Sequence, residues 1–240
     1  MNSLSCKLNL PLGPSLRDPA LEADLQARLD DGHRIFALGD VHGHLATFKA
    51  LLHRLDLKPE DRVICLGDMI DRGPNSAGVV ELIRTHPQII CLKGNHEHMA
   101  AEAVRLDDQP PYLLKLKRDM LKRGIPFKRM IQWMGHWPIK WENPYVLITH
   151  AGISLHARDP FNPDSSRGVL HNRSPLKDVG KLQIFGHVVQ EDFQPRYFAD
   201  SHAWCIDTGA WRGGGLTGIR LTRTGEIIEI LREPTSESDL

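Results

Sequence analysis

Five short clusters in the sequence combine glycine with side chains that can bind a metal ion or transfer a proton. Each one ends a hydrophobic run, and they are Gly39–Gly43 (GDVHG), Gly67–Gly73 (GDMIDRG), Gly94–His98 (GNHEH), Thr149–Gly152 (THAG) and Gly186–His187 (GH). One such cluster alone is compatible with a polar loop tip. Five of them at the ends of hydrophobic runs favour a shared metal site.

The spacing of these residues predicts two neighbouring metal ions. Asp40 and His42 are two residues apart, so in an extended strand their side chains point the same way and can bind one ion together. Asp68, at the end of the next predicted strand, can bind the same ion and bridge to a second one through its other oxygen. Asn95, His150 and His187 complete the coordination of the second ion. This mixture of oxygen and nitrogen ligands suits Mn²⁺, iron or Zn²⁺ better than Ca²⁺, and Mn²⁺ is the first choice.

A pair of ions at this place indicates hydrolysis of a phosphate compound. Two divalent ions, two carboxylates and a bridging hydroxide carry a small net positive charge, which favours an incoming phosphate dianion. Ions about 4 Å apart can polarise the phosphate oxygens and hold a deprotonated water for in-line attack. The sequence contains no GxSxG, P-loop or Cys-x5-Arg signature that would supply a covalent nucleophile.

His96 is predicted to act as a general acid and not as a ligand. Consecutive side chains diverge, so His96 points away from the ion that Asn95 binds and faces the leaving group. Asp71 can hold the second ring nitrogen of His96 and raise its pKa, and Arg72 can bind phosphate oxygens through two N–H groups. For each histidine taken alone, the alternative is a structural hydrogen bond.

The first hundred residues have the pattern of a parallel α/β sheet. Three hydrophobic runs are predicted strands, at 34–40, 62–68 and 88–95. Helical spacing predicts a helix between successive strands, at 44–55 and 76–86, and a short amphipathic helix before them, at 19–29. Such sheets place their sites at the carboxyl ends of the strands, which is where the polar clusters stand.

The segment between His98 and Trp141 has helical spacing throughout, with candidate helices at 97–105 and 112–123. It contains seven clustered basic residues, Lys115, Lys117, Arg118, Lys122, Arg123, Lys128 and Arg129. They indicate either a solvated helix face or a basic lip beside a site for phosphorylated partners.

After Trp141 the sequence changes to short predicted strands, at 145–152, 181–187, 202–209, 216–222 and 226–233. The last two flank Arg223-Thr224-Gly225 and predict a hairpin. The segment 157–176, rich in Pro, Asp, Ser and Arg, is a predicted loop over the site. Because no repeat or interdomain linker is visible, we expect a single domain, with a frayed tail at 233–240.

Composition limits the class of protein. With 240 residues, of which 41% are hydrophobic, the chain can bury a substantial core without disulfides. Lys and Arg balance Asp and Glu at 30 each, and stable nucleic-acid binding is not expected. The cysteines form no CxxC pair, Cys65 and Cys91 lie inside apolar runs, and no run approaches the length of a membrane span. These features predict a soluble cytoplasmic protein, with a monomer as the expected state.

Taken in order, the motifs GDVHG, GDMIDRG, GNHE, HAG and GH resemble those of the calcineurin-like metallophosphoesterases, over residues 34–231. The GDxxDRG form is similar to the phosphoprotein phosphatase branch, including its bacterial and phage Ser/Thr phosphatases. The resemblance implies a four-layer α/β/β/α sandwich with two mixed β-sheets. It implies an N-terminal arm and short helix at 1–32, a catalytic domain at 33–232, and the ligands and acid pair already assigned from the residues.

The resemblance also implies a second phosphate-binding arginine, Arg173, which matches the family's arginine motif by its order in the chain. Two residues depart from the family pattern. Val188 stands where GHT has its threonine, so a hydroxyl that would help to orient a ligand is missing. His171 replaces the usual tryptophan of the arginine motif, which would change the shape or polarity of the pocket wall.

The predicted site determines hydrolysis at phosphorus but not the group that is attached to it. The first hypothesis is a protein Ser/Thr phosphatase, with phosphotyrosine as an additional substrate, because this compact chain leaves little to cover the site. The alternative is a symmetrical hydrolase of dinucleoside polyphosphates such as diadenosine tetraphosphate, whose bases Trp204 and Trp211 could stack. A catalytically dead phosphate-binding scaffold is disfavoured by the complete ligand set. The expected partner is a phosphorylated protein or a small phosphoester.

Overall fold

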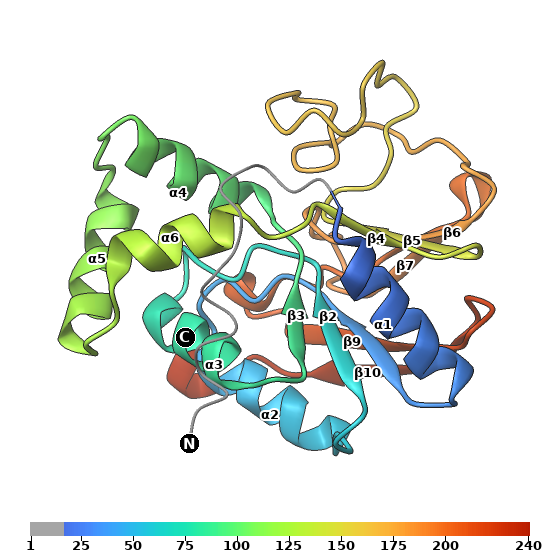
Figure 1. Ribbon diagram of the computed structural model, residues 1–240, viewed down its shortest axis with the longest axis horizontal. Helices are drawn as coiled ribbons and strands as arrows, with labels where there is room; N and C mark the ends of the chain where they lie inside the picture. The colour runs from blue at the N-terminus through green and yellow to red at the C-terminus, as the bar shows by residue number, and fades with distance from the viewer. Residues whose placement is uncertain (1–16) are drawn as a thin grey trace.

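The computed structural model describes residues 17–240, and the part of the predicted N-terminal arm before residue 17 lies outside the described residues. Two five-stranded sheets form the body of the protein (Figure 1). Sheet A has the strand order β10-β9-β1-β2-β3, and sheet B has the order β4-β5-β6-β8-β7. Both contain parallel and antiparallel pairs, which confirms the prediction of two mixed sheets.

Sheet A is built on the three strands that were predicted from the first hundred residues. Its strands are β1 (Ile35–Leu38), β2 (Arg62–Cys65), β3 (Ile89–Cys91), β9 (Leu216–Leu221) and β10 (Ile227–Glu233). The first three run parallel, with α2 (Leu45–Leu55) and α3 (Ser76–Thr85) as the connecting helices. The predicted hairpin is present, since β9 pairs with β10 in antiparallel register.

Sheet B contains two edge strands that were not predicted. Its members are β4 (Lys140–Glu142), β5 (Val146–Thr149), β6 (Leu182–Phe185), β7 (Arg196–Phe198) and β8 (Ala203–Cys205). The strands β4 and β7 lie at the two edges of the sheet and have three residues each. A run of three residues is too short to establish a period of two, so the sequence carried no clear signal for them.

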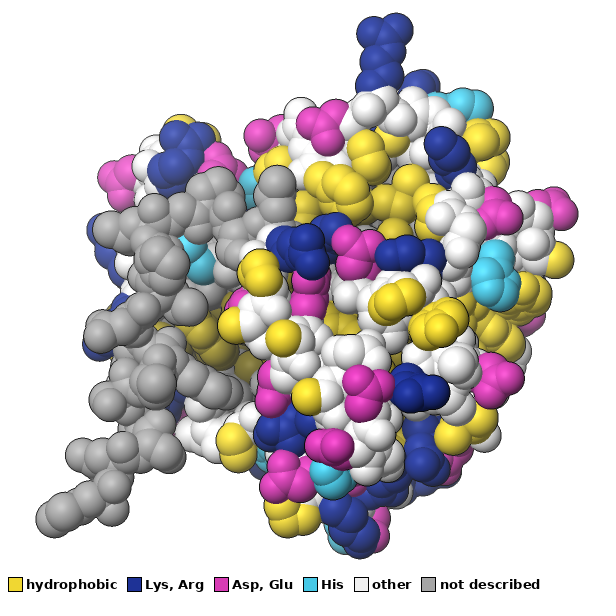
Figure 2. All heavy atoms as spheres, turned by 45° about the vertical axis from the view of Figure 1, so that its right-hand side comes forward, with side chains coloured by type: hydrophobic (Ala, Val, Ile, Leu, Met, Phe, Trp, Pro, Cys, Tyr) yellow, Lys and Arg dark blue, Asp and Glu magenta, His cyan; other side chains and the backbone are white. Residues whose placement is uncertain are grey.

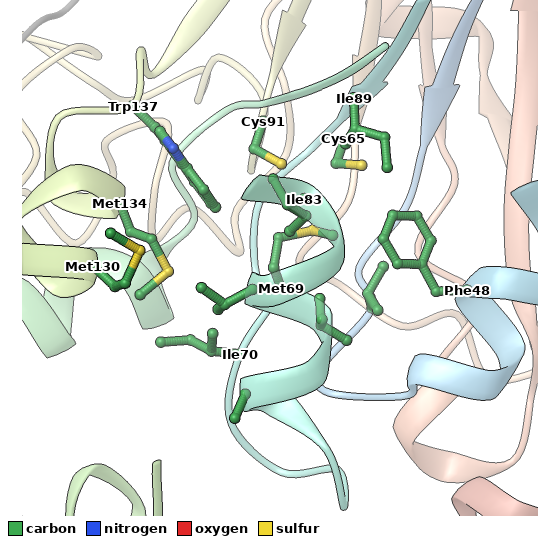
Figure 3. Packing of buried hydrophobic residues seen from close by; sticks show 14 of the residues in the cluster. Phe48, Cys65, Met69, Ile70, Ile83, Ile89, Cys91, Met130, Met134 and Trp137 are labelled. Atoms are coloured by element: carbon green, nitrogen blue, oxygen red, sulfur yellow. The ribbon is translucent and has the colours of Figure 1, made fainter. Parts of the chain in front are cut away.

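Side chains on alternate faces of sheet A enter two separate cores. Phe36 and Leu38 pack under α2 and α3, whereas Ile35 and Ala37 face sheet B and pack with residues such as Ile148. This alternation follows from the pleat of a strand, and it explains why the strand sequences are apolar throughout. Figure 3 shows the first core, in which side chains of α3 and sheet A pack in one cluster with Met130, Met134 and Trp137.

The outer face of sheet B differs from the expected helical layer. Leu147 of β5 packs there against Ile153, Val169 and Leu170, which belong to a segment without regular helix or strand. The predicted loop at 157–176 therefore serves as the fourth layer. The amphipathic helix predicted at 19–29 is α1 (Pro19–Asp30), whose Leu25 joins the core between the sheets.

Three helices form a lobe beside sheet A (Figure 1). They are α4 (Asn95–Arg105), α5 (Pro111–Lys122) and α6 (Phe127–Gly135). Their basic residues are largely exposed, as the solvated-face interpretation expects. One of them extends toward the site, because Lys115 Nζ donates to the carbonyl of Pro74, two residues after Arg72.

The prediction of a frayed tail at 233–240 is wrong. The tail ends in a short 3₁₀ helix, η4 (Glu237–Asp239), that packs on the start of α2. The buried carboxylate of Asp239 accepts hydrogen bonds from the backbone N–H groups of Ala46 and Thr47 and from the Thr47 hydroxyl. A carboxylate at a helix N-terminus accepts hydrogen bonds from the free N–H groups and interacts favourably with the positive end of the helix dipole. The polar composition of the tail therefore did not mean disorder.

Figure 2 shows basic and acidic side chains interspersed over the face it presents. Within residues 17–240, no helix combines the length and the hydrophobicity that crossing a bilayer would require. Cys65, Cys91 and Cys205 are buried, and Cys65 and Cys205 are free thiols.

Candidate metal centre and active site

All six predicted ligands are buried at the ends of strands from both sheets. Asp40 and His42 follow β1, Asp68 follows β2 and Asn95 follows β3, whereas His150 and His187 follow β5 and β6 of sheet B. Because the two sheets pack face to face, these strand ends meet in one region. The structure thus brings together residues that are up to 147 positions apart in the chain, such as Asp40 and His187.

Four acceptor groups converge where the second ion was predicted. The Nε2 atom of His150 lies 3.0 Å from Asn95 Oδ1, 3.1 Å from His187 Nδ1 and 3.4 Å from Asp68 Oδ2. The other ring nitrogen of His150 donates to the carbonyl of Leu66 at 3.0 Å. A neutral His150 that carries its proton on Nδ1 presents the lone pair of Nε2 to the other three acceptors. This donor set fits a cation better than it fits a hydrogen-bond network.

Of the group predicted for the first ion, His42 and Asp68 lie together, and the Asp40 carboxylate accepts hydrogen bonds from the backbone N–H of His187. The Nδ1 atom of His42 donates to the carbonyl of Ile70 at 3.0 Å, and its Nε2 lies 3.5 Å from Asp68 Oδ2. The same Asp68 oxygen faces both groups, because Oδ1 accepts from the backbone N–H of His96 at 3.0 Å. The sequence predicted one carboxylate oxygen for each ion; in the structure a single oxygen lies between the two places.

The pKa shifts of two ligand histidines favour the form that binds metal. Burial lowers the pKa of His42 to about 3, and burial together with the charge of His150 lowers the pKa of His187 to about 2. Both imidazoles are therefore neutral, which is the form that binds metal. Burial, with Asp207 and Asp68 nearby, raises the pKa of Asp40 well above its usual range. A buried carboxylate with acidic neighbours is stabilised by a bound cation.

The role of His96 as a general acid and not a ligand stays a prediction. His96 lies beside the group predicted for the first ion, because ligand atoms of His96, His42 and Asp68 all lie within 4.8 Å of one another. Its Nδ1 donates to Asp71 Oδ2 at 2.9 Å, and its Nε2 lies 3.8 Å from Asp68 Oδ2. Burial lowers the pKa of His96, but the hydrogen bond to Asp71 and the charges of Asp68 and Asp71 outweigh it, so the pKa is raised. The pKa of Asp71 is lowered, because its bond to His96 outweighs its burial. The two shifts agree and favour an ion pair.

Arg72 is held against an aromatic ring instead of a carboxylate. Its guanidinium carbon lies 4.1 Å from the centre of the Trp211 ring, and one N–H group lies 3.3 Å from His96 Nε2. Trp211 belongs to the short 3₁₀ helix η3 (Ala210–Arg212), and its ring is 6.3 Å from that of His42. Since a stacked guanidinium keeps its N–H groups free, Arg72 can still bind phosphate oxygens.

Arg173 lies in the segment that connects β5 and β6 of sheet B. It is exposed, and its charge contributes to lowering the pKa of His187. Among residues 17–240 the structure gives Arg173 no ion pair. His171, the departure from the family pattern, is partly buried with its ring 6.1 Å from that of His98 on α4. It therefore lines the side of the site nearer the helical lobe.

Glu97 is a structural residue of the site whose role the sequence analysis did not assign. Its fully buried carboxylate accepts hydrogen bonds from four backbone N–H groups, those of Asp68, Met69, Ile70 and Gly94. The carboxylate thereby ties the loop after β2 to the start of α4. The bond from the N–H of Gly94 to Glu97 is the glutamate half of a capping box, but glycine has no side chain for the other half, so the usual Ser/Thr-x-x-Glu signal is absent from the sequence.

The backbone around the site is unusual. Nine non-glycine residues among those described have positive φ, and five of them are predicted site residues: His42, Asp68, Asp71, Arg72 and His187. This conformation costs of order 1 kcal/mol or more and persists where surrounding contacts impose it. Two glycines allow close approach, because a Cβ atom on Gly94 or Gly186 would lie 2.2 Å from a carboxylate oxygen of Asp68 or Asp40. The flanking glycines were the visible signal of this geometry.

Comparison with known proteins identifies relatives for most of the chain. The sequence profile described as "Calcineurin-like phosphoesterase" matches residues 33–210. Serine/threonine-protein phosphatase 2 of Salmonella typhimurium is 37% identical over 211 residues, covering 78% of this chain and 92% of that protein. Serine/threonine-protein phosphatase 2 of Escherichia coli is 43% identical over 75 residues, and the match spans about a third of each protein, 31% of this chain and 34% of the relative.

A second group of relatives is named for a different activity. The symmetrical bis(5'-nucleosyl)-tetraphosphatase of Pectobacterium atrosepticum is 31% identical over 124 residues, which is 50% of this chain and 43% of that protein. Among solved structures, the cold-active protein-tyrosine phosphatase of a Shewanella species aligns with a TM-score of 0.59 at 18% identity, covering 85% of this chain and 80% of the other. At that identity the alignment shows a shared fold.

Proposed function

The chain belongs to the calcineurin-like phosphoesterase family, and from this membership we propose that it is a metal-dependent phosphatase of phosphoserine and phosphothreonine in proteins. The observation that carries the proposal is the convergence of Asn95, His150, His187 and Asp68 beside the hydrogen-bonded pair of His96 and Asp71. A metal centre next to a proton donor is the arrangement that hydrolysis of an alkyl phosphate requires.

In the proposed site six side chains would hold two divalent ions, and Asp68 would serve both. Asp40 and His42 would complete the coordination of the first ion. The other three ligands, Asn95, His150 and His187, would complete that of the second. Such ions supply a water of lowered pKa and withdraw charge from phosphate oxygens. The ligand types favour Mn²⁺, with iron or Zn²⁺ as alternatives.

His96 is the proposed general acid. Its imidazolium would give the Nε2 proton to the oxygen that leaves with the serine or threonine side chain. Asp71 keeps the ring oriented through the 2.9 Å bond to Nδ1 and stabilises the charged form. Arg72 and Arg173 would bind the phosphate oxygens through charge-assisted hydrogen bonds.

The choice of a protein substrate is supported by sequence and by the surroundings of the site. The relative that this chain covers at 92% of its length is named a serine/threonine-protein phosphatase. Trp211, considered above for stacking a nucleobase, has Arg72 over its ring at 4.1 Å. Trp204 packs against Tyr197 with their ring centres 5.5 Å apart. Neither ring is thus arranged as an open platform for a base.

A symmetrical dinucleoside tetraphosphatase is the second candidate function. It is favoured by the relatives with that name, which are matched over half of this chain. The metal centre would be the same, and the difference would lie in the group attached to the phosphorus.

Several further properties belong to the same proposal. We assign the catalytic unit to residues 33–232, acting as a monomer on phosphorylated proteins or small phosphoesters without stable binding of nucleic acid. Free buried thiols at Cys65 and Cys205 support a reducing compartment, for which the cytoplasm is the proposal.

A substrate panel on metal-loaded protein tests the proposal. We expect kcat/KM for phosphoserine and phosphothreonine peptides to exceed that for diadenosine tetraphosphate, and all hydrolysis to stop after exhaustive chelation and to return with Mn²⁺. Magnesium should restore less activity, because imidazole is softer than Mg²⁺ prefers. A clear preference for the dinucleotide would select the second candidate, and turnover that survives chelation would contradict the metal centre itself.

A further inference from the structure

A pocket of about 580 Å³ borders the candidate metal centre on the side of sheet B. Its wall contains Ala151 and Val188, which directly follow His150 and His187 in the chain. Arg173 also lines it, and the charge of Arg173 is felt by His187. The pocket and the proposed phosphate site therefore share a border, and a substrate bound at the phosphate site has this pocket within its immediate reach.

The floor of the pocket is apolar. Phe185, which is buried, packs with Leu176 and Phe198 in a small hydrophobic cluster separate from the two large cores. Leu176 and Phe198 are only partly buried, and all three side chains line the pocket. Apolar side chains that end at an open pocket leave surface whose burial by a ligand would be favourable.

Two polar side chains of the pocket, Asn172 and Gln190, make hydrogen bonds within the chain, whereas the exposed charged side chains Arg173 and Asp200 stand in its lining. The amide of Asn172 donates to the carbonyls of Ala151 and Ser174 and accepts from the backbone N–H of Ser174. The amide of Gln190 donates to the carbonyl of Val188. A ligand with many polar edges, such as a nucleobase, would find these two amides already bonded within the chain, whereas an aliphatic side chain needs no such partner.

The departure from the family's GHT motif, Val188 in place of threonine, makes this part of the pocket wall less polar. The family pattern has threonine at this position, and its hydroxyl would add a polar group to the wall. Valine has nearly the same shape but offers only methyl groups, so the wall beside His187 is apolar.

We propose that this pocket binds an apolar side chain next to the phosphorylated residue of a peptide substrate, and thereby sets the sequence preference of the phosphatase. The inference rests on the proposed function as a protein phosphatase. Arg173 on the border would hold the phosphate while the neighbouring side chain, such as leucine, enters the pocket. The volume of about 580 Å³ is ample for one side chain of this size.

Two phosphothreonine peptides that differ only in the following residue, leucine or glycine, test the proposal. We expect kcat/KM for the leucine peptide to be about 10-fold higher, the discrimination that a hydrophobic pocket gives for a few methylene groups. Ala199→Trp, which places an indole at the pocket wall, should lower kcat/KM for the leucine peptide about 10-fold and bring the ratio close to one. Val188→Thr, of almost unchanged shape, should reduce the ratio to about 3-fold by adding a hydroxyl.

The control variant is Ala23→Trp, an exposed alanine that lines a different surface pocket beside α1. It should leave the peptide ratio unchanged. Hydrolysis of p-nitrophenyl phosphate, which has no neighbouring residue, should stay within about 2-fold in Ala199→Trp and Ala23→Trp, as expected for changes outside the catalytic contacts.

The outcomes separate this inference from the proposed function. Hydrolysis of both peptides at equal rates by the unmodified protein would overturn the pocket assignment while leaving the phosphatase assignment intact. An equal loss for both peptides and the aryl phosphate in Ala199→Trp would also overturn it. Turnover of the aryl phosphate without any turnover of phosphopeptides would overturn the proposed function, and this inference with it.

Discussion

At the ends of the sheet A strands, the proposed catalytic side chains are braced by other residues. Glu97 binds four backbone N–H groups across two loops, Asp71 holds His96 at 2.9 Å, and Trp211 stacks on Arg72 at 4.1 Å. At the ends of the sheet B strands, His150 and His187 are buried, but Arg173 stands exposed at the edge of a 580 Å³ pocket.

We call the strand ends of sheet A and the loops that follow them the sheet A rim, and those of sheet B the sheet B rim. From this difference we infer that the two rims have different tasks. Reaction chemistry needs groups that are held in one geometry, and the sheet A rim provides them. Selection of a substrate needs open surface, and the sheet B rim provides it. Substitutions on the sheet A rim should therefore act on the chemical step, and the predictions below run from the largest expected effect to the smallest.

Asp68→Asn should have the largest effect, because Asp68 Oδ2 lies between the two proposed ion groups, one of which includes histidines from sheet B. We expect loss of bound metal together with a fall in kcat/KM of more than about 10⁴-fold, beyond what a proton donor alone contributes. Metal analysis of the purified variant by mass spectrometry, alongside its kinetics, measures both. Full metal occupancy would show that Asp68 is not a shared ligand.

His96→Asn should lower kcat by about 10²–10⁴-fold while both metals stay bound. This loss applies to poor leaving groups such as a serine alkoxide, and it should shrink for p-nitrophenyl phosphate, whose leaving group needs little protonation. The same metal analysis decides the role of His96. If the variant loses metal as Asp68→Asn does, then His96 is a ligand and the assignment of Asn95 is wrong.

Asp71→Asn should give a milder loss, about 10- to 100-fold, as is typical when the partner that orients an imidazole is removed. The pH dependence is the sharper readout. Asp71 raises the pKa of His96, so its removal should lower that pKa, and the imidazolium is then lost at a lower pH. We expect the alkaline limb of the kcat profile for an alkyl phosphate to move to lower pH. An unmoved limb would mean that Asp71 does not act through His96.

Trp211→Leu should have the smallest effect of the four. It removes the stacking partner of Arg72, worth about 0.5–2 kcal/mol, so KM should rise by roughly 2- to 30-fold with little change in kcat. Trp133→Leu on α6, where Trp133 packs against Trp137 away from the site, is the matched control and should leave KM unchanged. A fall in kcat at constant KM would place Trp211 in the chemical step.

The local patterns of the sequence predicted the elements of sheet A well. The strands after which Asp40, Asp68 and Asn95 stand are long apolar runs that end at glycine, and both features depend on neighbouring residues alone. The edge strands β4 and β7 are too short to show a period. The tail at 233–240 is polar, yet it is ordered by contacts with α2, which is about 190 positions earlier in the chain.

What the sequence determined by itself is the set of side chains that can bind metal and transfer a proton, because residue type, spacing and flanking glycines are local. What only the tertiary structure decided is how they face one another. The packing of sheet A on sheet B brings His150 within 3.4 Å of Asp68, directs one Asp68 oxygen toward both ion groups, and leaves the pocket open beside Val188. These relations depend on contacts between segments far apart in the chain, and no periodicity along the sequence encodes them.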